Sequence, residues 1–161
     1  MAYQKLQLAL AADVIKSDTI DIPLESSSQI TGESDAGVAN KLTDAAIDFT
    51  AIQGLVNGAI IVNVTDGTIA TVTAIDSAHV LSLSANIISG AGKAYKIYLN
   101  PTANHGVGAI IYVGGAGDLK VKTASGSIVT YTGIPAGFFV PVQVLRVYST
   151  DTTATGLIAN W

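Results

Sequence analysis

The stretch GAIIVNVTDGTIATVTAIDSAHVLSLS, residues 58–84, decides the fold class of this chain. Apolar and polar residues alternate on both sides of Asp66-Gly67, and an Asp-Gly pair between two alternating runs is a strong signal for a β-hairpin. A second turn is expected at Ser77-Ala78. The alternation predicts that one face of the first strand carries Ile60, Val62 and Val64, and that the other face carries Asn63 and Thr65.

The rest of the chain has the same character. Short runs rich in β-branched and aromatic residues are separated by glycine, proline and serine turns, as in all-β proteins. Only residues 38–55 could hold a helix, and their irregular apolar spacing predicts no more than a turn or two. The further runs are AYKIYL (94–99), GAIIYV (108–113), DLKVKT (118–123), SIVTYTGI (127–134) and FVPVQVLRVY (139–148).

Composition excludes several classes of function. The 161 residues include no cysteine, so disulfides, thiolate metal sites and cysteine nucleophiles are impossible. Only 12% of the residues are charged, the net charge is −4, and the basic residues form no cluster, which argues against a nucleic-acid partner. No apolar run approaches the roughly 20 residues of a membrane span, so no membrane partner is expected.

A glycine-rich stretch, YVGGAGDLKV at residues 112–121, invites comparison with phosphate-binding loops. Such loops need a helix after the glycines, so that free N–H groups at the helix N-terminus face the phosphate. Here the following residues alternate with a period of two, and no Lys-Ser or Lys-Thr pair follows the glycines. We therefore predict a hairpin turn between two strands.

The remaining polar residues do not form a recognisable reactive site. The two histidines lack a second ligand at metal-like spacing, and the serines at 26–28 lack the surroundings of a nucleophile. Three aspartates near the start could bind a cation at most weakly, because the glycine and final glutamate of a calcium loop are missing. We predict no catalytic residue, no cofactor, no metal and no enzyme activity. The residues considered are His79, expected as a partly buried structural imidazole, His105, and Asp13, Asp18 and Asp21.

The last third of the chain, residues 112–161, resembles the C-terminal part of the small spike-base and decoration-type virion proteins of tailed phages and gene transfer agents. Those proteins also tend to begin with a phrase like the SDTIDIP found here at residues 17–23. The matching residues of the C-terminal part are Tyr112, Gly117, Asp118, Val129, Thr130, Tyr131, Thr132, Gly133, Pro135, Ala136, Gly137, Pro141, Val144, Arg146, Val147, Tyr148, Thr152, Thr153 and Ala154.

Some eighty residues separate these two phrases, and they are similar to a small β module of phage structural proteins. We therefore expect an antiparallel β-sandwich or barrel domain that is discontinuous, made of residues 1–23 and 102–161. Residues 24–101 would form a small SH3-like β-barrel inserted into one of its loops, where insertions are tolerated. The residues that match the module include Ala39 to Leu42, Asp44, Phe49, Gly58, Asn63, Thr65 to Thr68 and Asp76.

The resemblance implies a structural virion protein, located on the capsid surface or at a vertex and made in the bacterial host cytoplasm. It would act as a decoration or cement protein or as a spike base, with further copies of itself, the major capsid protein or other virion proteins, and a fibre protein as partners. A tail or baseplate piece is a variant of this reading. A carbohydrate-binding adhesin module of the virion is the rival, with Tyr95, Tyr98, Tyr112, Tyr131 and Tyr148 as available aromatics.

The two ends of the chain are the predicted interface, because apolar terminal segments are costly to expose unless something covers them. Two alternatives stay open for each end: it contacts a neighbouring molecule, or it docks within its own domain as an edge strand. The candidate interface residues are Tyr3, Leu6, Leu8, Leu10, Leu157, Ile158 and Trp161.

Overall fold

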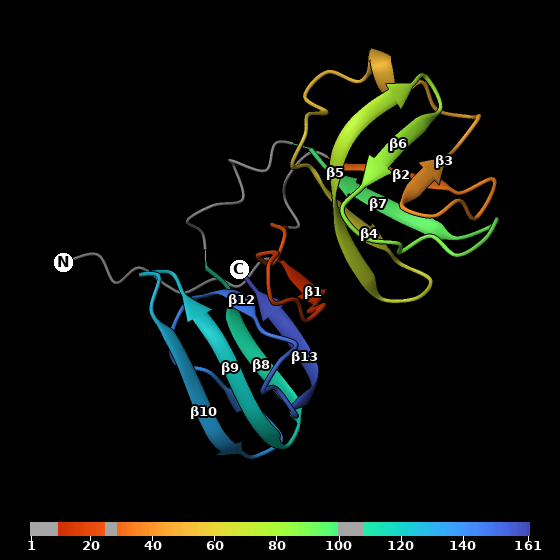
Figure 1. Cartoon of the computed structure of the whole chain (residues 1–161). Coiled ribbons are helices and arrows are strands. Elements are labelled where there is room, and N and C mark those ends of the chain that lie inside the picture. The colour runs from red at the N-terminus through yellow and green to blue at the C-terminus, as the bar shows by residue number, and fades with distance from the viewer. Residues whose placement is uncertain (1–9, 25–28, 100–107) are drawn as a thin grey trace. The chain divides into compact units, whose positions relative to one another are not determined.

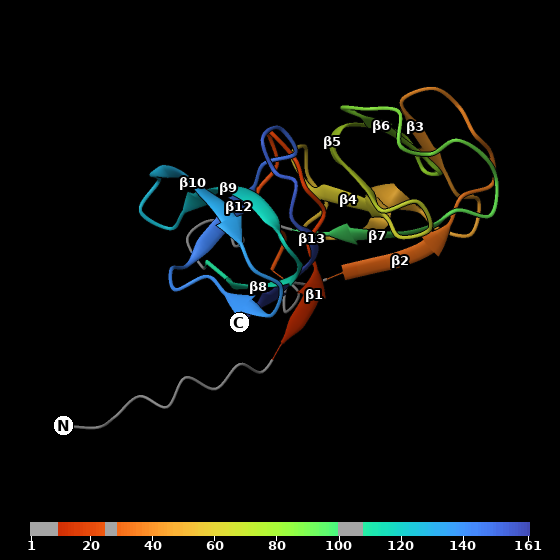
Figure 2. The ribbon, with the colours of Figure 1, turned by 90° about the horizontal axis from the view of Figure 1, so that it is seen from below.

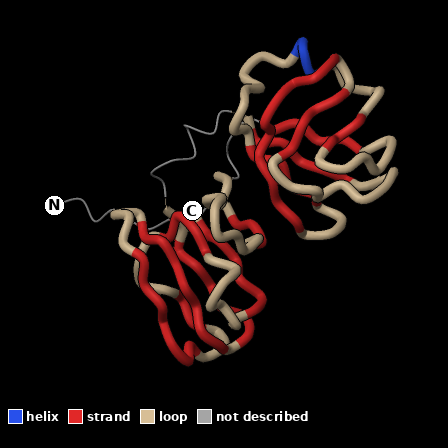
Figure 3. Tube along the Cα trace, in the orientation of Figure 1, coloured by secondary structure: helices blue, strands red, loops and turns tan. Residues whose placement is uncertain are grey.

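A computed structural model describes residues 10–24, 29–99 and 108–161 of the chain. These residues form an all-β protein in which every paired strand runs antiparallel to its neighbours. The described part contains one helix, a single 3-10 turn at Phe49–Ala51 (Figure 3). The all-β prediction is thus confirmed, and so is the limit of one or two helical turns within residues 38–55.

The chain divides into two compact units. Unit 1 contains residues 1–26 and 106–161, and unit 2 contains residues 27–105 (Figure 1). The domain boundaries expected from sequence lie within a few residues of these limits. Each unit has its own sheets and its own hydrophobic core.

Unit 1 is built from two sheets. The first has the strand order β1-β13-β8-β11, and the second has the order β10-β9-β12 (Figures 1 and 2). An isolated bridge between Ala109 and Val144 joins the chain before β8 to β12. The bounds are β1 Ala11–Asp13, β8 Ile110–Gly115, β9 Gly117–Thr123, β10 Ile128–Ile134, β11 Phe138–Phe139, β12 Val144–Val147 and β13 Thr155–Asn160.

One core lies between the two sheets of unit 1. Alternate residues of β8, β9 and β13 point into it, as the period of two requires, while a register shift in β12 places its two core residues three positions apart. The N-terminal segment contributes Ile22, which is buried in the same core as strands from the far end of the sequence. The buried strand residues are Ile111 and Val113 of β8, Leu119 and Val121 of β9, Val144 and Val147 of β12, and Leu157 and Ala159 of β13.

Unit 2 is a curled six-stranded sheet with the order β2-β7-β4-β5-β6-β3. The long strand β5 serves both halves, since it pairs with β4 near its start and with β6 near its end. The two edges meet where the backbone N–H of Asp35 donates to the carbonyl of Thr43 at 2.8 Å. The bounds are β2 Gln29–Glu33, β3 Lys41–Thr43, β4 Ile60–Asn63, β5 Thr68–Ser77, β6 Val80–Leu83 and β7 Ala94–Tyr98.

The core of unit 2 contains a buried hydrogen bond between side chains. The hydroxyl of Tyr95, which is 1% exposed, donates to Oδ2 of Asp44 at 2.6 Å. Burial, together with this neighbouring carboxylate, raises the pKa of the Tyr95 hydroxyl, so the tyrosine stays protonated. Phe49, in the only helical turn described, is fully buried in the same core.

The predicted hairpin around Asp66-Gly67 is confirmed, with β4 pairing with β5 through Asn63 and Thr68. Gly67 takes the left-handed conformation that the turn requires, with φ of 65°. The predicted faces hold for Ile60, Val62 and Asn63, but Val64 and Thr65 lie in the turn and not in the strand. Asn63 is completely buried, because its side of β4 faces the core of unit 2, while Val64 is 55% exposed.

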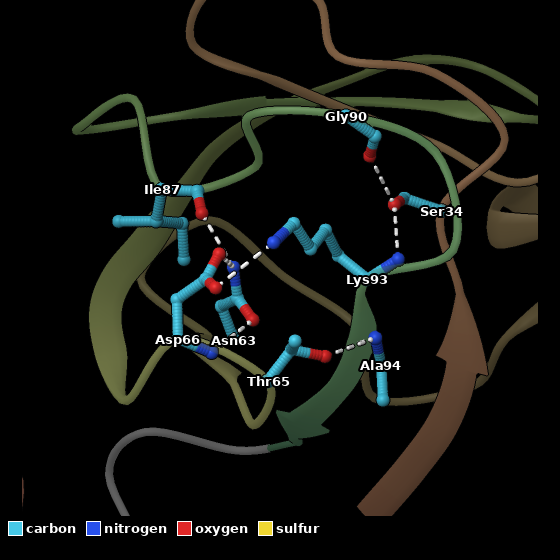
Figure 4. A network of polar contacts seen from close by, with 8 residues as sticks. All are labelled: Ser34, Asn63, Thr65, Asp66, Ile87, Gly90, Lys93 and Ala94. Atoms are coloured by element: carbon cyan, nitrogen blue, oxygen red, sulfur yellow. Dashed lines mark hydrogen bonds and ion pairs between the residues drawn. The ribbon is translucent and has the colours of Figure 1, made fainter.

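The buried Asn63 is fully used by its neighbours (Figure 4). Its amide nitrogen donates to the carbonyl of Ile87 at 2.7 Å and to Oδ2 of Asp66 at 2.9 Å, and its amide oxygen accepts the N–H of Asp66. Nζ of Lys93 then binds the other carboxylate oxygen of Asp66 at 2.9 Å. A buried amide with all of these partners stabilises the turn at little desolvation cost.

The same network also includes Ser34, which directly follows the edge strand β2. The hydroxyl of Ser34 donates to the carbonyl of Gly90 and accepts the N–H of Lys93 (Figure 4). The N–H of Ala94 donates to the hydroxyl of Thr65 at 2.9 Å. Several residues that carried the resemblance to a phage β module therefore have a structural role, joining the hairpin turn to the loop before β7.

Candidate interaction surface

The described parts of the two chain ends that the sequence marks as interface candidates pair with each other inside unit 1. The N–H and carbonyl of Leu10 bond to the carbonyl and N–H of Trp161, at 3.2 and 3.0 Å. β1 continues this pairing along β13, with Asp13 opposite Ile158. Docking within the domain is therefore the alternative that the structure shows for the described part of both ends.

The predicted interface residues that the structure describes differ in how deeply they are buried within unit 1. Leu157 is buried in the core of unit 1, so it offers no surface to another molecule. Trp161 is partly buried against this core, and Leu10 and Ile158 are also partly buried. Tyr3, Leu6 and Leu8 lie outside the described residues. The C-terminal strand is thus a structural element of unit 1.

The glycine-rich stretch joins two strands, as predicted, but it is not a hairpin. β8 and β9 belong to different sheets, and the chain crosses from one to the other at Ala116. The prediction of a hairpin failed because a short glycine link between two strands does not specify whether they pair.

The glycines of this crossing are needed for close backbone packing. A Cβ atom on Gly117 would lie 2.6 Å from the backbone nitrogen of Ala154, and one on Gly114 would lie 2.8 Å from the carbonyl oxygen of Gly156. Asp118, at the end of the stretch, accepts the N–H groups of Thr153 and Ala154 at its backbone carbonyl. The stretch is therefore a packing site for residues 153–156, not a phosphate loop.

The phrase SDTIDIP forms a clasp over the C-terminal half of unit 1, which we call the aspartate clasp and define as residues 17–22. Its backbone covers β12, since the N–H of Ser17 donates to the carbonyl of Val147 and the N–H of Ile22 donates to that of Leu145. The hydroxyl of Ser17 accepts the N–H of Ile20 at 3.1 Å, which folds the segment locally.

Two carboxylates hold the clasp in place. Asp21, 7% exposed, binds Nε of Arg146 at 2.7 Å and Nζ of Lys122 at 3.4 Å. Asp18 accepts the N–H of Thr150 at 3.0 Å and the hydroxyls of Ser149 and Thr150 at 2.8 Å. These hydrogen bonds, led by the Thr150 N–H, hold the pKa of Asp18 at about 2.

The clasp brings together two motifs that carry the resemblance. SDTIDIP, residues 17–23, contacts RVYST, residues 146–150, far along the chain. Among the described residues, no group of three or more histidine, aspartate or glutamate side chains could hold a metal ion. His79 is exposed in the turn before β6, where its Nδ1 lies 2.8 Å from the carbonyl of Ile47, so the expected partial burial is wrong. His105 lies outside the described residues.

The surface that stands out is made by two consecutive edge strands of unit 1. β10 pairs only with β9, and β11 pairs only with β8, so each lies at the end of its sheet. Four of the large apolar side chains exposed on the described surface belong to them: Ile128 (59%), Val129 (37%), Phe138 (40%) and Phe139 (51%). We refer to these four residues as the edge patch.

The edge patch includes an aromatic pair. The ring of Phe139 lies 5.1 Å from that of Tyr112 on the neighbouring strand, with the planes tilted by 56°. This geometry is favourable for two aromatic rings. Exposed aromatic side chains are enriched at the centre of protein contact surfaces.

The sequence contains a pattern that indicates the edge patch, although our prediction of the interface did not use it. No charged residue and no histidine occurs between Lys122 and Arg146, although this segment contains two exposed edge strands. Soluble proteins normally place charges on such edges. An uncharged segment of this length is therefore a sign of a contact surface, but only once its strands are known to be edges.

No protein-family model matches the chain, and neither curated proteins nor solved structures give a match. No helix among the described residues is long and apolar enough to cross a membrane.

Proposed function

We propose that this protein is a structural subunit of a tailed-phage virion that assembles with copies of itself and binds the shell. In this proposal it is a capsid decoration or cement protein, or the base of a vertex spike. The observation that carries the assembly role is the edge patch, four exposed large apolar side chains on two edge strands that themselves carry no charge. The phrases shared with spike-base and decoration-type proteins support the virion role.

A binding role also fits what the polar residues of unit 1 do. Asp18 and Asp21 bind side chains and backbone of their own unit, and the glycine stretch packs against residues 153–156. These groups serve to hold together a sandwich whose edge strands β10 and β11 remain available. A rigid scaffold with apolar edges suits a subunit of a symmetric assembly, in which the same surface is used in every copy.

The proposal is tested on the parent particle. Virions would be purified from a lysed host culture, their proteins identified by mass spectrometry, and the particle reconstructed by cryo-electron microscopy. We expect the chain in multiple copies in a ring or lattice on the shell, with the edge patch buried. A tail or baseplate position would keep the structural role and change the location. Absence of the chain from the particles would overturn the proposal.

The carbohydrate-binding alternative is tested on the exposed aromatic pair. Tyr112 and Phe139 could stack on a sugar ring, and a glycan array would detect such binding directly. Under the assembly proposal we expect no saccharide to bind. Binding that is lost in Phe139→Ala and kept in Tyr148→Phe would favour an adhesin module instead.

A further inference from the structure

β10 differs from every other edge strand that the structure describes. It is seven residues long and contains neither a charge nor a proline. The others are short or carry a charge: β1 ends at Asp13, β2 contains Glu33, β3 begins at Lys41, and β11 has two residues. The outer side of β12 is covered by the aspartate clasp. Charges, prolines, bulges and covers are the usual protection of an edge against pairing. Of these, β10 has only a register shift between Tyr131 and Ile134, which lies beyond the residues 128–131 that pair regularly with β9.

The backbone of β10 presents hydrogen-bonding groups outward. The N–H of Thr123 donates to the carbonyl of Ser127 at 2.8 Å, which identifies this pair as hydrogen-bonded in the β9-β10 ladder. Hydrogen-bonded and non-hydrogen-bonded pairs alternate along antiparallel strands. The N–H and C=O groups of Ile128 and Thr130 consequently point away from β9, and toward the open side of the sheet.

The side chains of β10 fit a partner strand. Val129 and Tyr131 lie opposite Val121 and Leu119, so they are on the core-facing side, yet Val129 remains 37% exposed. Ile128 is on the other side and is 59% exposed. A further strand along this edge would cover apolar surface on both sides of the sheet and would also pair the outward backbone groups.

We infer that two copies of this chain pair through β10, antiparallel, about a two-fold axis at Thr130. This inference depends on the assembly role proposed above and names its contact. With Thr130 opposite the second copy's Thr130, the alternation places Val129 opposite the second copy's Tyr131. Such a pair of a β-branched and an aromatic side chain stabilises a sheet. The two three-stranded sheets become one sheet of six strands.

Charge favours a second copy as the occupant of this edge. Because β10 is uncharged, two copies bring no like charges together at the axis. The nearest basic groups on β9 are held by carboxylates of their own chain: Lys120 binds Asp151 at 2.9 Å, and Lys122, at 3.4 Å, shares Asp21 with Arg146. An isologous contact of this kind is the commonest arrangement in protein dimers.

The test uses the full-length chain and opposite charges at Thr130. Thr130→Glu places a carboxylate opposite Lys120 within the chain, which the folded monomer tolerates, but places two carboxylates together at the axis. We expect the dissociation constant of the dimer, measured by analytical ultracentrifugation, to rise by about fivefold or more. Thr130→Lys alone should weaken the dimer similarly, and mixing the two variants should restore it.

A matched control comes from unit 2. Thr31 is also an exposed threonine on an edge strand, and it lies opposite Lys96 as Thr130 lies opposite Lys120. Thr31→Glu should leave the dissociation constant unchanged. Fluorescence of Trp161, the single tryptophan, would verify that unit 1 of each variant is folded.

A cross-link tests the register. Hydrogen-bonded pairs in antiparallel sheets have Cα atoms about 5.5 Å apart, within the range of a disulfide. Since the chain has no cysteine, Thr130→Cys should give a disulfide-linked dimer on mild oxidation, and Ser125→Cys should not. An oligomer that is unaffected by Thr130→Glu, or a wild-type chain that stays monomeric up to its solubility limit, would overturn the β10 contact. The virion role is judged separately, by the presence of the chain in particles.

Discussion

At the scale of single residues, glycines decide how closely the crossing from β8 to β9 packs against residues 153–156. Gly114 and Gly117 lie against the backbone of residues 153–156, where a side chain has no space. Gly90, in unit 2, has no atom within 4 Å of the position that a Cβ would take. The same residue type is therefore essential at one place and replaceable at another.

We predict that Gly117→Ala destabilises unit 1 by about 1–3 kcal/mol, because the new methyl group must displace the backbone at Ala154. Differential scanning calorimetry of the whole chain would measure the change. Gly90→Ala is the control and should leave the unfolding temperature within experimental error. A Gly117→Ala variant as stable as the wild type would show that residues 153–156 can move away without loss.

At the scale of elements, the aspartate clasp is the segment that makes unit 1 from two distant pieces of sequence. It covers the outer side of β12 and neutralises Arg146. The ion pair between Asp21 and Arg146 is a single contact. Its effect extends to the whole unit because Ile22, at the end of the clasp, is part of the core.

The clasp gives unit 1 a pH dependence whose sign follows from Asp18. The pKa of its carboxyl is lowered to about 2 in the folded chain, below the usual 3.8, so its contribution is complete above pH 3.8 and is lost as the pH falls toward 2. We predict that Asp18→Asn flattens the loss of stability between these values. Urea unfolding followed by Trp161 fluorescence would measure it, with Glu33→Gln in unit 2 as the control. A profile unchanged by Asp18→Asn would contradict the assignment.

At the scale of the whole molecule, the two units are separate folding candidates, since each has its own core and sheets. We predict that residues 27–105 expressed alone fold into a β protein with a cooperative thermal transition by circular dichroism. A fragment of residues 27–83, which lacks β7, should stay unfolded, because β7 lies between β2 and β4 in the sheet. A disordered 27–105 fragment would show that unit 2 needs the rest of the chain.

Much of this architecture could be predicted from short-range patterns. The alternation around Asp66-Gly67 predicted β4, β5 and their turn, and turn residues marked most of the other strand ends. The patterns did not indicate that Asn63 faces a core, since its burial depends on Ile87 and Asp66 closing around it. The edge patch was missed for a related reason, because exposure at β10 depends on which strands pair.

By itself, the sequence determined that the chain is all-β, where most of its strands and turns lie, and that it has no cysteine chemistry. These properties follow from residue type and a period of two, which act between near neighbours. Only the tertiary structure decided which strands share a sheet, that Asp21 meets Arg146, and that Ile128 and Phe139 remain exposed. Those outcomes depend on contacts between residues far apart along the chain, and such contacts leave no local pattern to be read.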